Sequence, residues 1–386
     1  MPSTAPTPYP AGLRTAVRAL LCMLALLLSA CGSLPSMPAR TASHALPQPQ
    51  STPLGQMVQA QRTAADTPYG SGFVLLGGAD AAFASRLALV EAATQTLDLQ
   101  YYAIHADPST ARLLHAIVQA AQRGVRVRIL LDDFHSAGKN AQIMRMAFVP
   151  GIEMRMFNPL TGPRGSTVIR TLTTLTDFQR AQQRMHNKLF IADNSIGIAG
   201  GRNLGDAYFD ALDSDNFIDL DIMAAGLVVR QLSASFDRYW NDARAYPVSA
   251  LITEKELLHL QSLQEASTPA TSATSAAERR IASLPPLNLQ AIDWIWAPAL
   301  VLADAPSKIP APPEDTAEAQ TTDTATQALI PHLPDSLSTH SSSPNRQALR
   351  NVLQPVVQQD NVINGLLALI DQAQHDVLIV SPYFVP

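Results

Sequence analysis

The sequence predicts an α/β fold in which helices flank a mixed β-sheet, and two observations lead to this prediction. From about Tyr69 onward, short apolar segments typical of strands alternate with longer segments whose apolar residues recur at helical spacing. The composition, with 47% hydrophobic and 15% charged residues over 386 positions, also suits a globular protein with substantial cores.

The predicted elements follow one another closely along residues 71–133. SGFVLLG (71–77) predicts a strand, and AFASRLALVEAAT (82–94) has the spacing of a helix. The next strand and helix are LDLQYYAI (97–104) and STARLLHAIVQAAQR (109–123). Gly124 ends that helix, and VRVRILLDD (125–133) predicts a third strand.

The same alternation continues to residue 243. IEMRMFN (152–158) predicts a strand, NKLFIAD (187–193) and IGIAG (196–200) predict a tight strand pair, and FIDLDIMAAG (217–226) predicts a further strand. VVRQLSASFDRYWNDA (228–243) is an amphipathic helix. One compact domain over residues 57–250 accounts for all of these elements.

Residues 1–31 are interpreted as a lipoprotein signal peptide. Basic residues precede an apolar run that is too short for a comfortable membrane span and ends in LSACG (28–32). This ending resembles a bacterial lipobox, in which Cys31 carries the lipid and Cys22 is removed with the peptide. Gly32 after the lipidated residue resembles lipoproteins of the outer membrane, so we expect that membrane, facing the periplasm. An ordinary secretory signal or an anchor helix is the alternative.

The segments that flank the domain differ from it in composition. Residues 32–56 are rich in Pro, Ser, Thr and Ala and predict a flexible tether, and residues 251–346 predict a low-complexity insertion or linker. Within the linker, a segment near residues 291–303 is apolar enough to be a buried strand, with Trp294 and Trp296 on one face.

A weak internal repeat relates the two ends of the chain. ALVEAATQTLDLQYYAI from Ala88 and ALIDQAQHDVLIVSPYF from Ala368 align without a gap at an offset of about 280 residues. Residues 347–386 therefore predict the start of a second, truncated copy of the first domain. We expect the natural sequence to continue beyond Pro386.

The most specific signal is the stretch RMHNKLFIADNSIGIAGGRN (184–203). On a strand, His186 and Lys188 would share one face, where an imidazole nucleophile and an ammonium group meet one ligand. Gly200 and Gly201 would let backbone amides approach an anion, and the Asn203 amide adds a donor. Asp193 would orient a donor in the same site or hold the turn. A chain of this composition has about 0.006 chance occurrences of H-x-K-x4-D.

Two further observations limit the kinds of partner and cofactor. A formal net charge of -5 gives no bulk attraction to a phosphate backbone, so we expect no nucleic-acid partner. Asp132, Asp133 and His135 follow a predicted strand and form an incomplete metal-ligand set, for which hydrogen bonding or lining of a cleft is the favoured interpretation. We therefore expect no metal and no cofactor. His105, Tyr101 and Tyr102 belong to a neighbouring strand end, and the two tyrosines are interpreted as half-core residues.

The spacing from His186 to Asn203 resembles the signature of the phospholipase D superfamily. The surrounding segments, among them LDLQYYAIHAD, GVRVRILLDD and SASFDRYWN, are similar to the bacterial cardiolipin synthase C type. The resemblance covers about residues 70–247 and implies a phospholipase D-like sandwich whose first repeat is complete and whose second is only begun. The long Ser/Thr/Pro segment departs from that family.

The resemblance also implies a mechanism. Two such motifs face each other without a metal, one histidine forms a phosphohistidine, and the other protonates the leaving alcohol. His186 would be one of these histidines, Lys188 and Asn203 would bind phosphate, and Asp193 would support the site. These 386 residues contain no second H-x-K, which the repeat would place near position 466. We therefore expect this stretch alone to be inactive.

The sequence thus predicts a membrane-anchored enzyme that acts on phospholipids, with cardiolipin synthesis as the specific reaction. It does not distinguish hydrolysis from transfer, nor which histidine is the nucleophile. A superfamily nuclease is one alternative, which would be expected to have a basic cleft and no lipid anchor. A catalytically incomplete lipoprotein that binds lipid is the other.

Overall fold

The structure is a computed structural model and describes residues 34–133, 138–160, 183–209, 216–258, 262, 276–306 and 362–377. Nine strands of the described residues form one sheet in the order β8-β4-β3-β2-β5-β6-β7-β1-β9. The strands are β1 (Ser71–Leu76), β2 (Thr96–Tyr101), β3 (Arg126–Asp132), β4 (Ile152–Phe157), β5 (Leu189–Ala192), β6 (Ile196–Gly200), β7 (Asp221–Gly226), β8 (Ala245–Pro247) and β9 (Ile295–Ala297).

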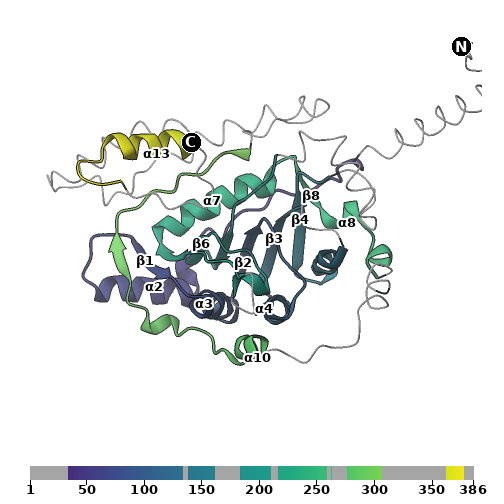
Figure 1. Ribbon diagram of the computed structural model, residues 1–386, viewed down its shortest axis with the longest axis horizontal. Coiled ribbons are helices and arrows are strands. Elements are labelled where there is room, and N and C mark those ends of the chain that lie inside the picture. The colour runs from purple at the N-terminus through teal and green to yellow at the C-terminus, as the bar shows by residue number, and fades with distance from the viewer. Residues whose placement is uncertain are drawn as a thin grey trace, which may run out of the picture.

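Helices cover both faces of this sheet. The α-helices are α2 (Pro53–Ala64), α3 (Ala79–Ala92), α4 (Pro108–Gln122), α7 (Leu227–Asn241), α8 (Val248–Leu251), α10 (Ala276–Ser283) and α13 (Val362–Asp371). The 3-10 helices are η1 (Pro49–Ser51), η2 (Gly138–Phe148), η3 (Asp206–Tyr208) and η4 (Leu289–Ala291). Figure 1 shows α7 on one side of the sheet and α3 and α4 on the other. The predicted α/β class, a mixed sheet flanked by helices, is confirmed.

Two hydrophobic cores hold these layers together. The larger core joins the sheet to α3 and α4 through buried side chains such as Phe83, Leu113 and Ile129. The smaller core joins the other face to α7 through Phe236 and Trp240, both 0% exposed. Burial of a large apolar side chain stabilises the fold by about 1.5–3 kcal/mol, so both layers are firmly attached to the sheet.

The direction of the central strands determines where the site lies. β2 and β3 are parallel, and so are β3 and β4, whereas β2 and β5 are antiparallel with Gln100 opposite Leu189. The carboxyl end of β2 and the amino end of β5 therefore meet at the same edge of the sheet. The residues just before β5 are brought next to those just after β2.

The segment before the domain differs from its prediction. Residues 32–56 were expected to be a flexible tether, but Arg40 donates to the backbone oxygens of Ala245 (2.7 Å) and Asn241 (3.1 Å) at the end of α7. We name residues 40–46 the N-terminal strap, because their backbone also bonds to the domain. Helix α2 begins at Pro53, and Thr52 is its N-cap, whose hydroxyl accepts a hydrogen bond from the Gly55 N–H. The predicted start of the domain at residue 57 is therefore too late.

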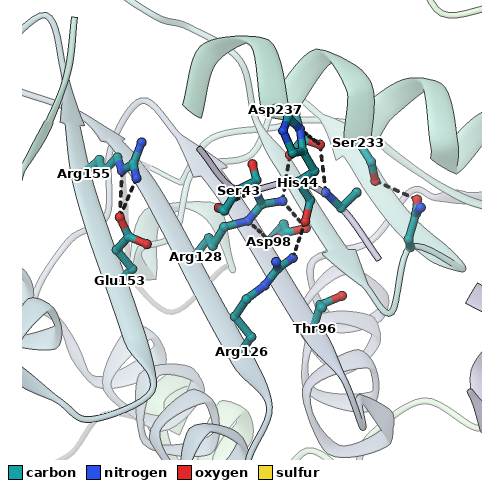
Figure 2. A network of polar contacts seen from close by, with 12 residues as sticks. Ser43, His44, Thr96, Asp98, Arg126, Arg128, Glu153, Arg155, Ser233 and Asp237 are labelled. Carbon is teal, nitrogen blue, oxygen red and sulfur yellow. Dashed lines mark hydrogen bonds and ion pairs between the residues drawn. The ribbon is translucent and has the colours of Figure 1, made fainter. Parts of the chain in front are cut away.

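A buried network of charges holds the strap in place (Figure 2). Arg128 on β3 lies between the carboxylates of Asp98 (2.6 Å) and Asp237 (2.8 Å) and also donates to the Ser43 backbone oxygen (2.8 Å). The Ala45 N–H donates to Asp237 at 2.8 Å. Because a buried charge is costly unless it is paired, these contacts make the strap part of the fold.

The linker contributes an edge strand rather than a buried one. Residues 295–297 form β9, which pairs with β1, and Ile295 is 71% exposed. Trp294 is buried and donates to the Gln61 side chain of α2 at 2.9 Å. Trp294 thus anchors the segment to α2, while β9 itself is the last strand at that edge of the described sheet.

Several predictions fall outside the described residues. These are the lipobox with Cys31, the loop residue His135, most of the linker, and the apolar segment 378–386 of the proposed second copy. Within the part of the chain that the structure describes, no helix is long and apolar enough to cross a membrane.

Candidate active site

His186 and Lys188 lie together at the edge where β2 ends and β5 begins. The Lys188 Nζ atom is 3.3 Å from His186 Nδ1 and 3.5 Å from Nε2, and it donates to the His186 backbone oxygen at 2.9 Å. Both residues were expected to lie on a strand. In the structure both precede β5, in an irregular segment. The prediction that their side chains meet nevertheless agrees with these distances.

The segment before His186 is fixed by Asp132 at the end of β3. The Asp132 carboxylate is fully buried and accepts from the Arg184 guanidinium (3.1 Å) and from the Met185 N–H (2.9 Å). The adjacent Asp133 accepts from the Leu160 N–H at 2.7 Å. These two carboxylates hold loops, in agreement with the hydrogen-bonding interpretation. No group of three or more His, Cys, Asp or Glu among the described residues is placed to bind a metal.

Lys188 is buried, with 7% of its surface exposed. Burial lowers the pKa of its ammonium group to about 8, because water no longer solvates the charge. The carboxylates of Asp219, Asp221 and Asp132 act in the opposite direction and favour the charged form. The Lys188 pKa thus lies near 8 rather than at its ordinary value, and an incoming phosphate anion would favour the protonated form further.

Tyr102, at the end of β2, contacts both of these side chains. Its ring lies 4.7 Å from the His186 ring with an interplanar angle of 56°, and the Lys188 Nζ is 5.6 Å from its centre. Tyr101 differs, since it is buried and its hydroxyl accepts from Arg86 at 3.1 Å. The half-core interpretation suits Tyr101, but Tyr102 belongs to the site.

Asp193 lies away from this centre, at the opposite end of β5. Its buried carboxylate accepts from the backbone N–H groups of Thr94 (3.0 Å), Gln95 (2.8 Å) and Thr96 (2.8 Å), and from the Thr94 hydroxyl (3.0 Å). The expectation that Asp193 shares a catalytic site with His186 is therefore corrected. Of the two predicted roles, the structure favours holding the turn, where Asp193 itself has a φ of 50°.

Gly200 and Gly201 pack closely against two aspartates. A Cβ atom at Gly200 would collide with Asp221, and one at Gly201 would collide with Asp219. The Gly201 N–H donates to the Leu220 backbone oxygen at 3.4 Å, so it belongs to the contact with the segment before β7. The two glycines are required for close approach to these carboxylates, and binding of phosphate by their backbone amides stays a prediction.

The Asn203 side chain is also engaged within the protein. Its Oδ1 atom accepts from the Ala103 N–H at 3.1 Å, and its Nδ2 atom donates to the Tyr208 hydroxyl at 2.8 Å. With 4% of its surface exposed, Asn203 joins the end of β2 to the turn that contains η3. In this arrangement it is a residue that shapes the site, and direct binding of phosphate stays a prediction.

Sequence reasoning missed the charges behind the glycines. Asp221 is fully buried and forms an ion pair with Arg86 (2.8 Å), and it lies 3.6 Å from Arg202. Burial lowers the pKa of Arg86, but Tyr101 and Asp221 outweigh it and raise that pKa above its usual value. Asp221 is the first residue of β7, and Asp219 lies two residues before it. In extended backbone a spacing of two places both carboxylates on one face, and this was the signal in the sequence that could have found them.

The domain that holds His186 and Lys188 matches a known protein family. Residues 87–240 match the family described as cardiolipin synthase, phospholipase D-like domain. The chain carries a phospholipase D-like domain. This domain contains His186, Lys188 and Tyr102, together with β2 to β7 of the sheet. The resemblance to the phospholipase D superfamily, of the cardiolipin synthase type, is confirmed.

Curated relatives share much of this phospholipase D-like domain. The chain is 39% identical over 232 residues to cardiolipin synthase C of Escherichia coli K12, which covers 59% of this chain and 48% of that protein. It is 28% identical over 167 residues to a cardiolipin synthase of Geobacillus kaustophilus, covering 43% of this chain and 31% of that protein. The chain thus spans less than half the length of these two relatives.

Solved structures resemble the phospholipase D-like domain more distantly. NucT from Helicobacter pylori is 14% identical with a TM-score of 0.34, covering 46% of this chain and 99% of that chain. Phosphatidylserine synthase of Haemophilus influenzae is 13% identical with a TM-score of 0.34, covering 56% of this chain and 50% of that chain. Scores this low do not bear on the function.

Proposed function

We propose that the protein is a phospholipase D-type enzyme that cleaves or exchanges the head groups of glycerophospholipids, with cardiolipin formation as the specific reaction. The observation that supports this most is the contact between His186 and Lys188 within a domain matched by a cardiolipin synthase family. An imidazole beside a partly desolvated ammonium group suits attack on a phosphodiester, whose negative oxygens the ammonium group stabilises.

The reaction would proceed in two displacements at phosphorus. In the first, one histidine nitrogen forms a bond to phosphorus while the bond to the departing alcohol oxygen breaks, and a second histidine donates a proton to that oxygen. In the second, an incoming alcohol loses its proton to the second histidine and attacks, and the bond between nitrogen and phosphorus breaks. His186 supplies one of these two groups, and we propose that a second motif outside these residues supplies the other.

Lys188 would bind the phosphate during both steps. The Lys188 Nζ atom lies 3.3 Å from His186 Nδ1, so its positive charge would be close to the phosphoryl oxygens during the proposed attack. Burial makes this charge costly, so an anionic substrate would stabilise the protonated form of Lys188 and raise its pKa. Substrate binding and protonation of Lys188 would thereby favour each other.

We also propose that Cys31 carries a lipid that holds the enzyme at the outer membrane, facing the periplasm. Support comes from the basic, apolar and small-residue pattern of residues 1–32. Labelling of growing cells with a fatty acid, followed by isolation of the protein, tests this proposal. We expect label in the protein as encoded and none after Cys31→Ser, and equal labelling of both would contradict the proposed anchor.

The substrate class is tested with the full-length protein. Purified enzyme is incubated with mixed vesicles of phosphatidylglycerol and phosphatidylethanolamine, and in parallel with single-stranded DNA, and the products are measured by mass spectrometry. We expect new phospholipid species with exchanged or lost head groups and intact DNA. Cleavage of the DNA without any change in the lipids would favour the nuclease alternative instead.

A further inference from the structure

We propose that Tyr102 is a positioning residue for the reaction, whose aromatic ring, and not its hydroxyl group, holds His186 and Lys188 in their working arrangement. This inference rests on the proposed function for its consequence in turnover. Its physical basis is independent of that function, because one ring contacts both side chains, at 4.7 Å for the imidazole and 5.6 Å for the ammonium nitrogen.

The support of the ring is rigid. Tyr102 directly follows β2, which pairs with β3 on one side and β5 on the other. The next residue, Ala103, donates its N–H to the buried Asn203 side chain at 3.1 Å. Tyr101 points into the core toward Arg86, so the following side chain points to the other face, toward the site. The backbone thus fixes where the Tyr102 ring can lie.

The two contacts have different effects. An aromatic ring near an ammonium group favours the charged form through its electron-rich face, and more so where water is excluded, as it is around buried Lys188. The His186 side chain is exposed, and an exposed side chain samples several rotamers. The tilted ring of Tyr102 restricts the imidazole to orientations near Lys188, which would reduce the entropy lost on reaching the reactive geometry.

Two substitutions separate this role from simple packing. Tyr102→Phe retains the ring and removes the hydroxyl, whereas Tyr102→Leu retains apolar bulk and removes the ring. If the residue only fills space, the two variants should behave alike. If the ring positions the two groups, only Tyr102→Leu should change the titration of Lys188 and the turnover number. Tyr69→Phe, at an exposed residue, serves as the control for loss of a tyrosine hydroxyl.

The titration is followed by NMR of lysine side chains in the full-length protein, with the Lys188 signal identified by its absence in Lys188→Arg. We expect the pKa of Lys188 to fall by about 0.5 unit in Tyr102→Leu and to stay unchanged in Tyr102→Phe. In parallel, kcat for phospholipid turnover should fall about tenfold in Tyr102→Leu with little change in KM, and by less than about twofold in Tyr102→Phe.

The two readouts keep this inference separate from the proposed function. A shifted Lys188 titration in Tyr102→Leu alone, in a protein that turns over no phospholipid, would support the contact with Lys188 and reject the proposed reaction. If the pKa of Lys188 is the same in the unsubstituted protein, in Tyr102→Phe and in Tyr102→Leu, the inference is overturned even if phospholipid turnover is observed. Equal losses of kcat in Tyr102→Phe and Tyr102→Leu would also overturn it, because the hydroxyl would then be the part that matters.

Discussion

The Asp193 carboxylate accepts a hydrogen bond from the Thr96 backbone N–H at 2.8 Å, at the end of β5 opposite to His186. The motif that contains both residues therefore has two parts with different tasks. Its first part would supply the reactive side chains of the proposed reaction, and its last part ties the turn between β5 and β6 to the start of β2. The stability of this turn and the chemistry of the site can thus be changed separately.

Asp193→Asn should lower stability, because an amide accepts the backbone N–H groups of residues 94–96 less well than a carboxylate does. We expect the free energy of unfolding to fall by about 1–3 kcal/mol in chemical denaturation. Turnover per folded molecule should change little. Unchanged stability together with lost turnover would show that Asp193 acts in the chemistry after all.

Lys188 should impose an alkaline limit on activity. Its pKa is lowered to about 8 by burial, so the charged form needed to bind phosphate is lost as pH rises through that value. We expect kcat/KM to decline above about pH 8 and this limb to be absent from the residual activity of Lys188→Met. A decline near the ordinary lysine pKa of 10.5 would show that Lys188 is not desolvated in solution.

The same titration should affect stability with the opposite sign. Between pH 8 and 10.5 the unfolded chain binds a proton at Lys188 that the folded chain has lost, so stability attributable to this group rises with pH over that range. Lys188→Met should remove this rise. The difference between the two proteins is measured as the denaturation midpoint at several pH values, and parallel curves would be inconsistent with the lowered pKa.

Asp219 should tune the alkaline limit, because its carboxylate favours the charged form of Lys188. In Asp219→Asn this support is lost, so the pKa of Lys188 should fall further and the alkaline limb should move to lower pH. Asp293→Asn, at an exposed residue before β9, is the matched control. A limb that stays in place in both variants would exclude electrostatic coupling between Asp219 and Lys188.

The N-terminal strap should contribute to the stability of the folded domain. Arg40→Met removes donors to the backbone oxygens of Ala245 and Asn241, which would leave those acceptors unsatisfied. We expect a loss of about 1–3 kcal/mol in the free energy of unfolding, whereas Arg230→Met at an exposed position of α7 should change little. Equal effects of the two substitutions would mean that residues 40–46 behave as a tether.

Most of the sheet could be predicted because each strand forms a short apolar run between helices with clear periodicity. The pairing of His186 with Lys188 could also be predicted, since a spacing of two residues in extended backbone places both side chains on one side. The role of Asp193 could not, although the predicted strand 187–193 already separates it from His186, because its partners at residues 94–96 follow from the pairing of β2 with β5.

Two other features depend on contacts that sequence patterns do not encode. The effect of Asp219 on Lys188 requires the order β5-β6-β7, which places the start of β7 beside the end of β6. The strap resembles a disordered tether in composition, yet Arg40 bonds to backbone oxygens, which every residue carries. Composition therefore underestimated its order.

The most direct test of the central proposal compares His186→Ala with His115→Ala in the full-length protein. His115 is an exposed histidine on α4, so its substitution controls for loss of an imidazole elsewhere in the same domain. Head-group exchange is measured by mass spectrometry on phosphatidylglycerol vesicles. The account predicts a loss of at least about a thousandfold in His186→Ala and none in His115→Ala. Turnover by His186→Ala at the unsubstituted rate would contradict the account.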